Sequence, residues 1–436
     1  MKGYTFGIDI GTTSICALAY DTENDKLLHA INRANTSAIA SPDTFARMQD
    51  TDVILKTAYG LLDELETAFG MPSAIGVTGQ MHGIVYLDAN GNAVSPLYTW
   101  QDARAAEEKE NGESYVEYIR RTTGYPVAAG YGLATHYYHH CNGMIPKDAV
   151  QLCTVHDFLA MKLADRTSPV VHASDAASLG LYDLQSNCFD TAAVQKLGFS
   201  KSILPTVTAG SEPIGYYKGT CPVYPAIGDN QASFLGSAGE TEGRLLVNIG
   251  TGSQVSVIGK LGDTPEGIEC RPFIGGKYLL VGSSLCGGRA YAILEKFFRA
   301  VANMCGADIS SAYPFMDKLI AQSTPTEPLT VSTLFDGTRA DPTIRGSISG
   351  ISINNLDPVS MMDGFMRGIA EELHALYQSM SGLLDTDVTV MIGSGNGLRV
   401  NPALCRIMEK TFGMPLTLSD NREEAALGAA KFANRS

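Results

Sequence analysis

The chain has 436 residues, of which 44% are hydrophobic and 18% are charged, the composition of an ordinary globular protein rather than of a disordered or fibrous one. This length exceeds one compact core, so we expect two folding units. The formal net charge of -14 repels phosphodiester backbones and anionic membrane surfaces, which argues against nucleic acid and membranes as partners.

The cysteines and the first residues indicate the compartment. Nine cysteines are scattered along the chain, an odd count without a Cys-x-x-Cys pair, as in proteins that keep reduced thiols in their core. The chain does not begin with a continuous apolar stretch, and no later stretch approaches the roughly 20 apolar residues that cross a bilayer. We therefore expect a cytoplasmic protein.

The N-terminal part of the chain predicts an antiparallel meander. Residues 4–10 form an apolar strand that leads into a Gly-Thr-Thr-Ser turn at 11–14, and a second apolar run ends at Tyr20. Residues 26–32 supply the third strand. The segments expected next are a helix at 52–69, a short strand at 74–78 and a polar loop at 79–83.

The same strand, turn and strand recur in the second half of the chain. Residues 245–257 match residues 6–18 position by position at a constant offset. In this alignment Asn248 stands against Asp9, Gly250 against Gly11, Thr251 against Thr12 and Ser253 against Ser14. Two such hairpins in register predict a duplicated domain with two turns that face phosphate groups.

Both turns have the groups that hold phosphate: glycines for close approach, backbone N–H groups and hydroxyl donors. The expected phosphate contacts are Gly11, Thr12 and Thr13 in the first turn and Gly250, Thr251 and Gly252 in the second. Asp9 can hold Mg²⁺ through water, whereas Asn248 is neutral. For either hairpin alone, an ordinary tight β-turn is an equal alternative.

The known glycine-rich nucleotide motifs are absent, since the sequence has no G-x-x-x-x-G-K-[ST] stretch and no G-x-G-x-x-G after a strand. A different glycine-rich turn, Gly393-Ser394-Gly395-Asn396-Gly397, lies between an apolar strand at 388–392 and an expected helix at 402–412. Such a turn can seat a nucleoside at the helix N-terminus, and a purely structural turn is the alternative.

Asp229 is the candidate general base. It lies in Ile-Gly-Asp-Asn-Gln-Ala, before an expected helix at 231–237. Its carboxylate can accept a proton from a sugar hydroxyl while Asn230 and Gln231 hold neighbouring hydroxyls. The alternative from the residues alone is a helix N-cap.

A second polar group predicts a sugar site. Gln80, Met81 and His82 fall in the loop between two apolar runs, and Trp100 and Asp102 follow. The indole can stack on a sugar face while the polar side chains bind its hydroxyls. A core Trp beside a satisfied His is the alternative.

The segment His136-Tyr-Tyr-His-His-Cys141 has two histidines one helical turn apart. It has no carboxylate at a matching position, so we interpret it as a polar helix face near the cleft rather than a zinc site.

Together these residues resemble the FGGY carbohydrate kinases of the actin-like ATPase fold, over nearly the whole chain. The landmarks are the segments 7–14, 77–83, 99–102, 228–233 and 393–395. The Gly-Gln-Met-His-Gly run at 79–83 recurs in the ketose kinases of that family. Segments 131–135, 154–157, 176–180 and 367–369 resemble the members that phosphorylate sedoheptulose more than those that phosphorylate xylulose.

The resemblance implies an α/β protein of two actin-like (ribonuclease H-like) ATPase domains with a catalytic cleft between them. Residues 1–222 would bind mainly the sugar and residues 223–436 mainly ATP, with the last helix packing back on the first domain. By motif match, Asp9 would hold the metal and Asp229 would act as the base. Residues 11–13 would bind the γ-phosphate, residues 250–252 the other phosphates, and residues 393–396 the adenosine. The residues that would bind the sugar are Gln80, Met81, His82 and Asp102.

The expected activity is phosphoryl transfer from Mg·ATP to the terminal hydroxyl of a ketose, with sedoheptulose preferred. The expected ligands are a ketose, ATP and Mg²⁺, and a homodimer is the assembly considered. The alternatives are a xylulose or other pentulose kinase, an actin-like ATPase without a sugar substrate, and a sugar sensor that does not consume ATP.

Overall fold

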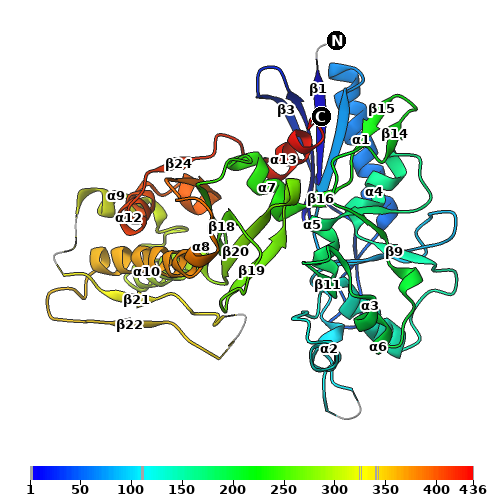
Figure 1. Cartoon of the computed structure of the whole chain (residues 1–436). Helices are drawn as coiled ribbons and strands as arrows, with labels where there is room; N and C mark the ends of the chain where they lie inside the picture. The colour runs from blue at the N-terminus through cyan, green and yellow to red at the C-terminus, as the bar shows by residue number, and fades with distance from the viewer. Residues whose placement is uncertain are drawn as a thin grey trace. The chain divides into compact units, whose positions relative to one another are not determined.

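The computed structural model describes residues 3–109, 112–323, 325, 327–338, 341 and 343–435. The chain forms two compact units (Figure 1). The first comprises Met1–Gly239, Pro272–Gly276 and Glu423–Ser436, and the second comprises Glu240–Arg271 and Lys277–Arg422. Within the described ranges, no helix combines the length and the hydropathy needed to cross a membrane.

The first unit is built on a mixed sheet with the strand order β14-β15-β6-β1-β2-β3, and β16 also pairs with β6. Its strands are β1 (Tyr4–Ile10), β2 (Ser14–Asp21), β3 (Lys26–Ala34), β6 (Ala74–Gly79), β14 (Gly215–Tyr217), β15 (Cys221–Val223) and β16 (Ile227–Gly228). The three N-terminal strands form the predicted antiparallel meander. In contrast, β1, β6 and β16 run parallel, so their carboxyl ends meet at one edge of the sheet.

The helices of this unit come from segments that are far apart in the chain. The principal ones are α1 (Thr51–Phe69), α2 (Tyr115–Thr123), α3 (Gly132–Cys141), α4 (Val155–Leu163), α7 (Asp229–Ser237) and α13 (Glu424–Phe432). The carboxylate of Asp50 caps α1 by accepting from the N–H groups of Asp52 and Val53, which fixes where that helix begins.

The C-terminal helix α13 packs against α7, β1 and β6 at very short range. A Cβ atom placed on Gly236 would lie 1.9 Å from the carbonyl oxygen of Glu424, and one on Gly428 would lie 1.8 Å from that of Ala232. Only glycine permits so close an approach of two helix backbones. These two glycines therefore fix how α7, which begins at Asp229, sits in the unit.

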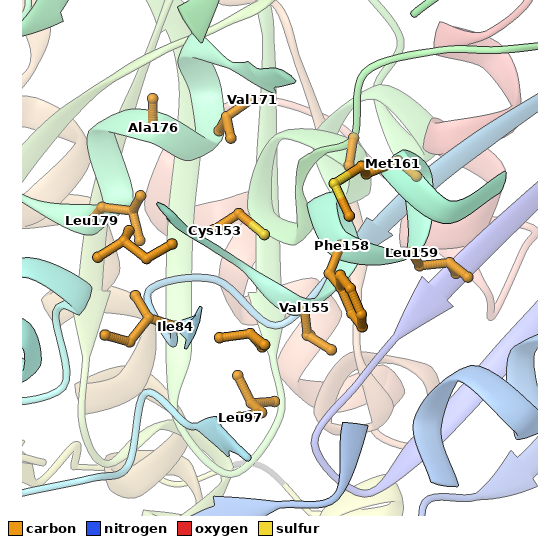
Figure 2. Packing of buried hydrophobic residues seen from close by; sticks show 14 of the residues in the cluster. Ile84, Leu97, Cys153, Val155, Phe158, Leu159, Met161, Val171, Ala176 and Leu179 are labelled. Carbon is orange, nitrogen blue, oxygen red and sulfur yellow. The ribbon is translucent and has the colours of Figure 1, made fainter. Parts of the chain in front are cut away.

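A large apolar core stabilises the first unit. Figure 2 shows part of it, where side chains of β9 (Gln151–Cys153), of α4 and of segments before and after them in the chain pack together. The labelled members, all buried, are Ile84, Leu97, Cys153, Val155, Phe158, Leu159, Met161, Val171, Ala176 and Leu179.

The second unit repeats the hairpin and its parallel neighbour. Its sheet has the order β19-β20-β18-β17-β23-β24. The strands are β17 (Arg244–Ile249), β18 (Ser253–Gly259), β19 (Ile268–Pro272), β20 (Tyr278–Ser284), β23 (Val390–Ser394) and β24 (Leu416–Leu418), and the helices include α8 (Gly287–Met304), α9 (Tyr313–Gln322), α10 (Pro358–Ser379) and α12 (Pro402–Phe412). Strand β17 pairs antiparallel with β18 and parallel with β23, as β1 does with β2 and β6. The predicted hairpin repeat is confirmed.

Two local expectations are corrected. The glycine-rich turn expected over residues 393–397 is much shorter, because β23 continues through Ser394 and the short helix α11 (Asn396–Arg399) begins after Gly395. That glycine has a φ of 84°. The cysteines are all free thiols, but Cys141, Cys188 and Cys305 are exposed rather than in the core.

Candidate functional site

The sheet edge of the first unit brings together the segments that the sequence singled out. Asp9 pairs with Thr78 across β1 and β6, and Ile227 pairs with the same Thr78 from β16. The Thr78 hydroxyl also donates to the carbonyl oxygen of Ile227 over 2.6 Å. Since the three strands are parallel, the residues at and beyond their carboxyl ends, Asp9 and Asp229 among them, lie at one edge.

The two carboxylates interact electrostatically. Burial and the charge of Asp229 raise the pKa of Asp9 to about 7, against a smaller opposing effect of His156 and with a further contribution from Glu423 that also raises it. A carboxyl group that resists ionisation beside another carboxylate favours a bound cation, which would relieve the repulsion. The donor set of this edge therefore fits a hard divalent cation.

Asp229 is the first residue of α7, and the N-cap of that helix is Gly228. The interpretation of Asp229 as an N-cap is therefore wrong. Met81 packs against the same point, because a Cβ atom on Gly228 would lie 2.6 Å from Met81 Cε. Asp229 and Asn230 are both partly exposed, and Met81 is buried.

Hydrogen bonds connect the first predicted phosphate turn with the predicted sugar loop. Gln80 Nε2 donates to Gln49 Oε1 over 2.7 Å, and Gln49 Nε2 donates to the Thr12 carbonyl over 2.8 Å. The Thr12 hydroxyl donates to Gln80 Oε1 over 3.3 Å and accepts from Trp100 Nε1 over 3.0 Å. Gln49 was missed from the sequence, because its neighbours in the chain carry no motif.

Trp100 is 47% exposed, so the alternative of a core tryptophan is wrong. Its indole N–H contacts the turn at Thr12. A ligand can reach the turn itself, since Gly11 and Thr12 are partly exposed and Thr13 is exposed.

His82 has an unusual backbone conformation. Its φ is 73°, in the left-handed region that costs a non-glycine residue roughly 1–2 kcal/mol. The N–H of His82 donates to Ser178 Oγ over 3.2 Å, and its ring is stacked on Tyr131 with the centroids 4.5 Å apart. Its Nδ1 lies 2.7 Å from the Ser178 carbonyl. Because a carbonyl only accepts, Nδ1 carries a proton.

Asp102 has strong partners inside the protein. It is 1% exposed, and its two carboxylate oxygens accept from Nε and Nη2 of Arg104 over 3.0 and 2.7 Å. The N–H of Arg47 donates to it as well. Contact between Asp102 and a sugar stays a prediction, and the geometry makes it an anchor for the segment that carries Trp100.

Two of the three histidines of α3, His136 and His139, are core residues, which corrects the interpretation of this segment as a polar helix face; His140 is exposed. The Tyr86 hydroxyl lies 2.8 Å from His136 Nδ1 and 3.1 Å from His139 Nδ1, and both rings are buried. Burial, with a smaller effect of His140 on His136 and of Arg104 on His139, lowers the pKa of each to about 3. Both rings are therefore neutral at physiological pH.

The second unit brings two of the predicted nucleotide segments together. Asn248 pairs with Ser394 across β17 and β23, and Asn248 Nδ2 donates to Ser394 Oγ over 3.0 Å. A Cβ atom on Gly395 would lie 2.5 Å from the Ile249 carbonyl. The turn at Gly250 thus lies beside the glycine-rich segment that ends with Asn396.

The N-terminus of α8 supports the same turn. The N–H of Gly288 donates to the Gly250 carbonyl, and that of Arg289 donates to the Thr251 carbonyl, each over 3.0 Å. A Cβ atom on Gly288 would lie 2.3 Å from that Gly250 oxygen. Sequence reasoning missed Gly287 and Gly288, although a glycine pair after an apolar strand was a usable signal.

The two sheets, each with an antiparallel hairpin and a parallel strand beside its first member, define an actin-like ATPase fold in two domains. Comparisons with known proteins agree. The model of the FGGY family of carbohydrate kinases matches with its N-terminal domain over residues 4–236 and with its C-terminal domain over residues 245–436. The chain belongs to the FGGY family of carbohydrate kinases. It is a phosphotransferase with an alcohol group as acceptor and ATP as phosphate donor.

Individual relatives differ in the substrate that their names give. The chain is 27% identical over 468 residues to a sedoheptulokinase of Mus musculus, with 98% of this chain and 96% of that protein covered. It is 24% identical over 463 residues to a glycerol kinase of Streptococcus sanguinis, with coverage of 99% and 89%. The solved structure of a xylulose kinase from Rhodospirillum rubrum matches with a TM-score of 0.85 at 22% identity, covering 99% of this chain and 89% of that one.

Proposed function

We propose that this carbohydrate kinase phosphorylates the terminal hydroxyl of a ketose, converting sedoheptulose to sedoheptulose 7-phosphate, with Asp229 as the general base. The single observation that carries the catalytic part is the position of Asp229, which follows β16 at the edge where β1 and β6 end. The substrate rests on the similarity to the sedoheptulokinases, which spans 98% of the chain.

Each residue of the edge has a proposed task. Asp229 accepts the proton of the attacking hydroxyl, which makes that oxygen a better nucleophile. Gln80, His82 and Asn230 bind other hydroxyls of the sugar, and Trp100 covers one of its faces. Because His82 Nδ1 is engaged by a carbonyl, the proposed acceptor for a sugar hydroxyl is Nε2.

Mg²⁺ is the proposed metal. Asp9 would hold it through water, and the ion would neutralise charge on the transferred phosphoryl group. The raised pKa of Asp9 supports this, since a cation beside the two carboxylates favours their ionised forms. The backbone N–H groups of residues 11–13 and 250–252 would contact phosphate oxygens.

The test is a comparison of Asp229→Asn with the unmodified enzyme. We expect kcat to fall by about a hundredfold or more, because the base is lost, while the affinity for the ketose in calorimetry changes by less than about threefold. Asp52→Asn, an exposed carboxylate on α1, is the matched control and retains full activity. Near-normal turnover of Asp229→Asn would show that another group is the base.

A pentulose kinase is the second candidate, favoured by the TM-score of 0.85 with a xylulose kinase. Comparison of kcat/KM for heptulose, pentulose and polyol substrates separates the two. A clear preference for D-xylulose would overturn the sedoheptulose assignment. An ATPase without a sugar substrate would release ADP at the same rate with and without any of these sugars.

A further inference from the structure

A fully buried polar cluster lies at the beginning of α4. Thr154 is the N-cap of this helix, His156 and Asp157 are in its first turn, and Asp175 comes from α5 (Ala173–Ala176). All four side chains have an exposed fraction of 1% or less. Their helix neighbours Val155, Phe158 and Leu159 belong to the apolar core in Figure 2. Burial of such a cluster costs folding free energy unless each charge is paired and the polar groups are hydrogen-bonded.

The geometry indicates how the protons are distributed. Thr154 Oγ1 lies 2.7 Å from Asp157 Oδ2 and 2.9 Å from Asp175 Oδ2, and a hydroxyl has a single proton to donate. It therefore donates to one carboxyl group and accepts from the other, which must be protonated. His156 Nε2 lies 2.9 Å from Asp175 Oδ2, so the ionised member is Asp175.

The pKa shifts agree with this assignment. Burial and the adjacent charge of Asp175 raise the pKa of Asp157 well above its usual range. Burial acts in the same direction on Asp175, but His156, Asp157 and Thr154 outweigh it and hold the pKa of Asp175 below its usual range. The cluster then has one protonated and one ionised carboxyl group.

The ionised carboxylate is connected to the loop that holds His82. Ser178 Oγ donates to Asp175 Oδ1 over 3.2 Å and accepts from the His82 N–H over 3.2 Å. The Ser178 carbonyl accepts from His82 Nδ1 over 2.7 Å. One residue thus holds both the backbone and the ring of a histidine whose φ is 73°.

The direction of these hydrogen bonds determines whether the Ser178 hydroxyl can accept from the His82 N–H. An acceptor as strong as ionised Asp175 orients the Ser178 hydroxyl proton away from the loop, so its lone pair faces the His82 N–H. Without Asp175, the hydroxyl could rotate and donate elsewhere, and the left-handed conformation of His82 would lose an essential partner.

We propose that Asp175, paired with His156, is a positioning residue for the sugar site, acting through Ser178 to hold His82 with Nε2 toward the ketose. This inference rests on the proposed function, in which His82 binds the sugar. The known family motif contains His82, whereas Asp175 and Ser178 lie about 90 residues further along the chain and reach it only through the fold.

The kinetic test uses Ser178→Ala, which removes the hydroxyl and keeps the carbonyl. We expect KM for the ketose to rise about tenfold, with kcat and KM for ATP within about twofold, because only sugar binding depends on His82. Ser256→Ala is the control, since Ser256 is also buried but lies in β18 of the second unit. A sugar KM unchanged in Ser178→Ala, or an equal rise in KM for ATP, would overturn the proposal.

The link to Asp175 needs a second variant. If Asp175 acts through Ser178, adding Asp175→Asn to Ser178→Ala should reduce kcat/KM for the ketose by less than about twofold beyond Ser178→Ala itself. If the two substitutions instead reduced kcat/KM for the ketose independently, so that their effects multiplied in the double variant, the link would be refuted. Should Asp175→Asn fail to fold, His156→Gln replaces it in the same cycle.

Nuclear magnetic resonance of His82 separates this proposal from the proposed function. In ¹⁵N-histidine-labelled protein without substrates, the His82 ring should show protonated Nδ1, and Ser178→Ala should change that signal whether or not a ketose is phosphorylated. A cation retained after dialysis against EDTA and lost in His156→Gln would contradict the proton assignment, since the three ligand atoms lie within 4.8 Å of one another.

Discussion

Replacement of Asp9 by Asn is expected to stabilise the first unit at neutral pH. The unmodified carboxyl group has a pKa of about 7 in the folded protein, against an ordinary value of 3.8, because removal from water and the charge of Asp229 both disfavour its ionised form. The folded state therefore holds a proton that the unfolded state has lost between these two values. Stability from this group is complete below pH 3.8 and is lost as the pH rises through 7.

The magnitude follows from the size of the shift. A difference of about 3 pKa units corresponds to about 4 kcal/mol over the full range, of which about 2.5 kcal/mol falls between pH 5 and the plateau above pH 7. Local relaxation and water entry reduce this, so we expect about 1–2.5 kcal/mol. The neutral amide of Asp9→Asn has nearly the shape of the protonated acid and does not ionise. The free energy of unfolding of Asp9→Asn, relative to that of the unmodified protein, should therefore rise by that amount from pH 5 to pH 8.

The assay is urea unfolding followed by tryptophan fluorescence, in the absence of Mg²⁺. Trp100 is the single tryptophan of the chain and lies in the first unit, so its emission reports that unit. Asp229→Asn should lower the pKa of Asp9 and reduce the same pH dependence. A free-energy difference between Asp9→Asn and the unmodified protein that is equal at pH 5 and pH 8 would refute the reasoning.

Two further predictions concern close packing and the exposed indole. Gly428→Ala should destabilise the first unit by about 2 kcal/mol or more, since its Cβ would lie 1.8 Å from the Ala232 carbonyl oxygen. Gly60→Ala, inside α1, should instead stabilise the unit by about 0.5–1 kcal/mol, because the nearest atom to its Cβ would be 3.7 Å away. Fluorescence-monitored unfolding compares them, and equal signs would contradict the backbone-contact argument. In steady-state kinetics, Trp100→Ala should raise KM for the ketose about tenfold and Trp100→Phe less than about threefold, because Phe keeps a stacking face. Equal effects would show that stacking is not involved.

Much of the local structure could be predicted because it follows from nearby residues. The meander at residues 4–34, helix α1 and the helix at 402–412 were expected within one or two residues of their observed bounds. Alternating or continuous apolar residues and flanking turn residues suffice for such elements. The glycine-rich segment before α11 was misjudged, because pairing with β17 extends β23 through residues that by themselves favour a turn.

The site was harder to predict, since it depends on partners that are distant in the chain. The sequence suggested that Asp102 is a sugar ligand, which stays a prediction, and it gave no sign of the buried salt bridge that the fold forms between Asp102 and Arg104. It suggested a polar face for His136, but the fold places that ring against Tyr86. Gln49 gave no signal, because an isolated Gln belongs to no recognisable motif, and Ser178 lay in a segment noted only for its resemblance to the family, with no role predicted for its side chain.

The amino-acid sequence by itself determined the repeated hairpins, the order of the elements and the resemblance that led to the carbohydrate kinases. These features are local or repeat along the chain, so they can be read from residue type and spacing. Only the tertiary structure decided that Asp9 and Asp229 share one sheet edge and that Ser178 joins Asp175 to His82. The physical reason is that parallel pairing of β1, β6 and β16, and the burial of α4, bring together groups whose pKa values and hydrogen bonds depend on distance in space.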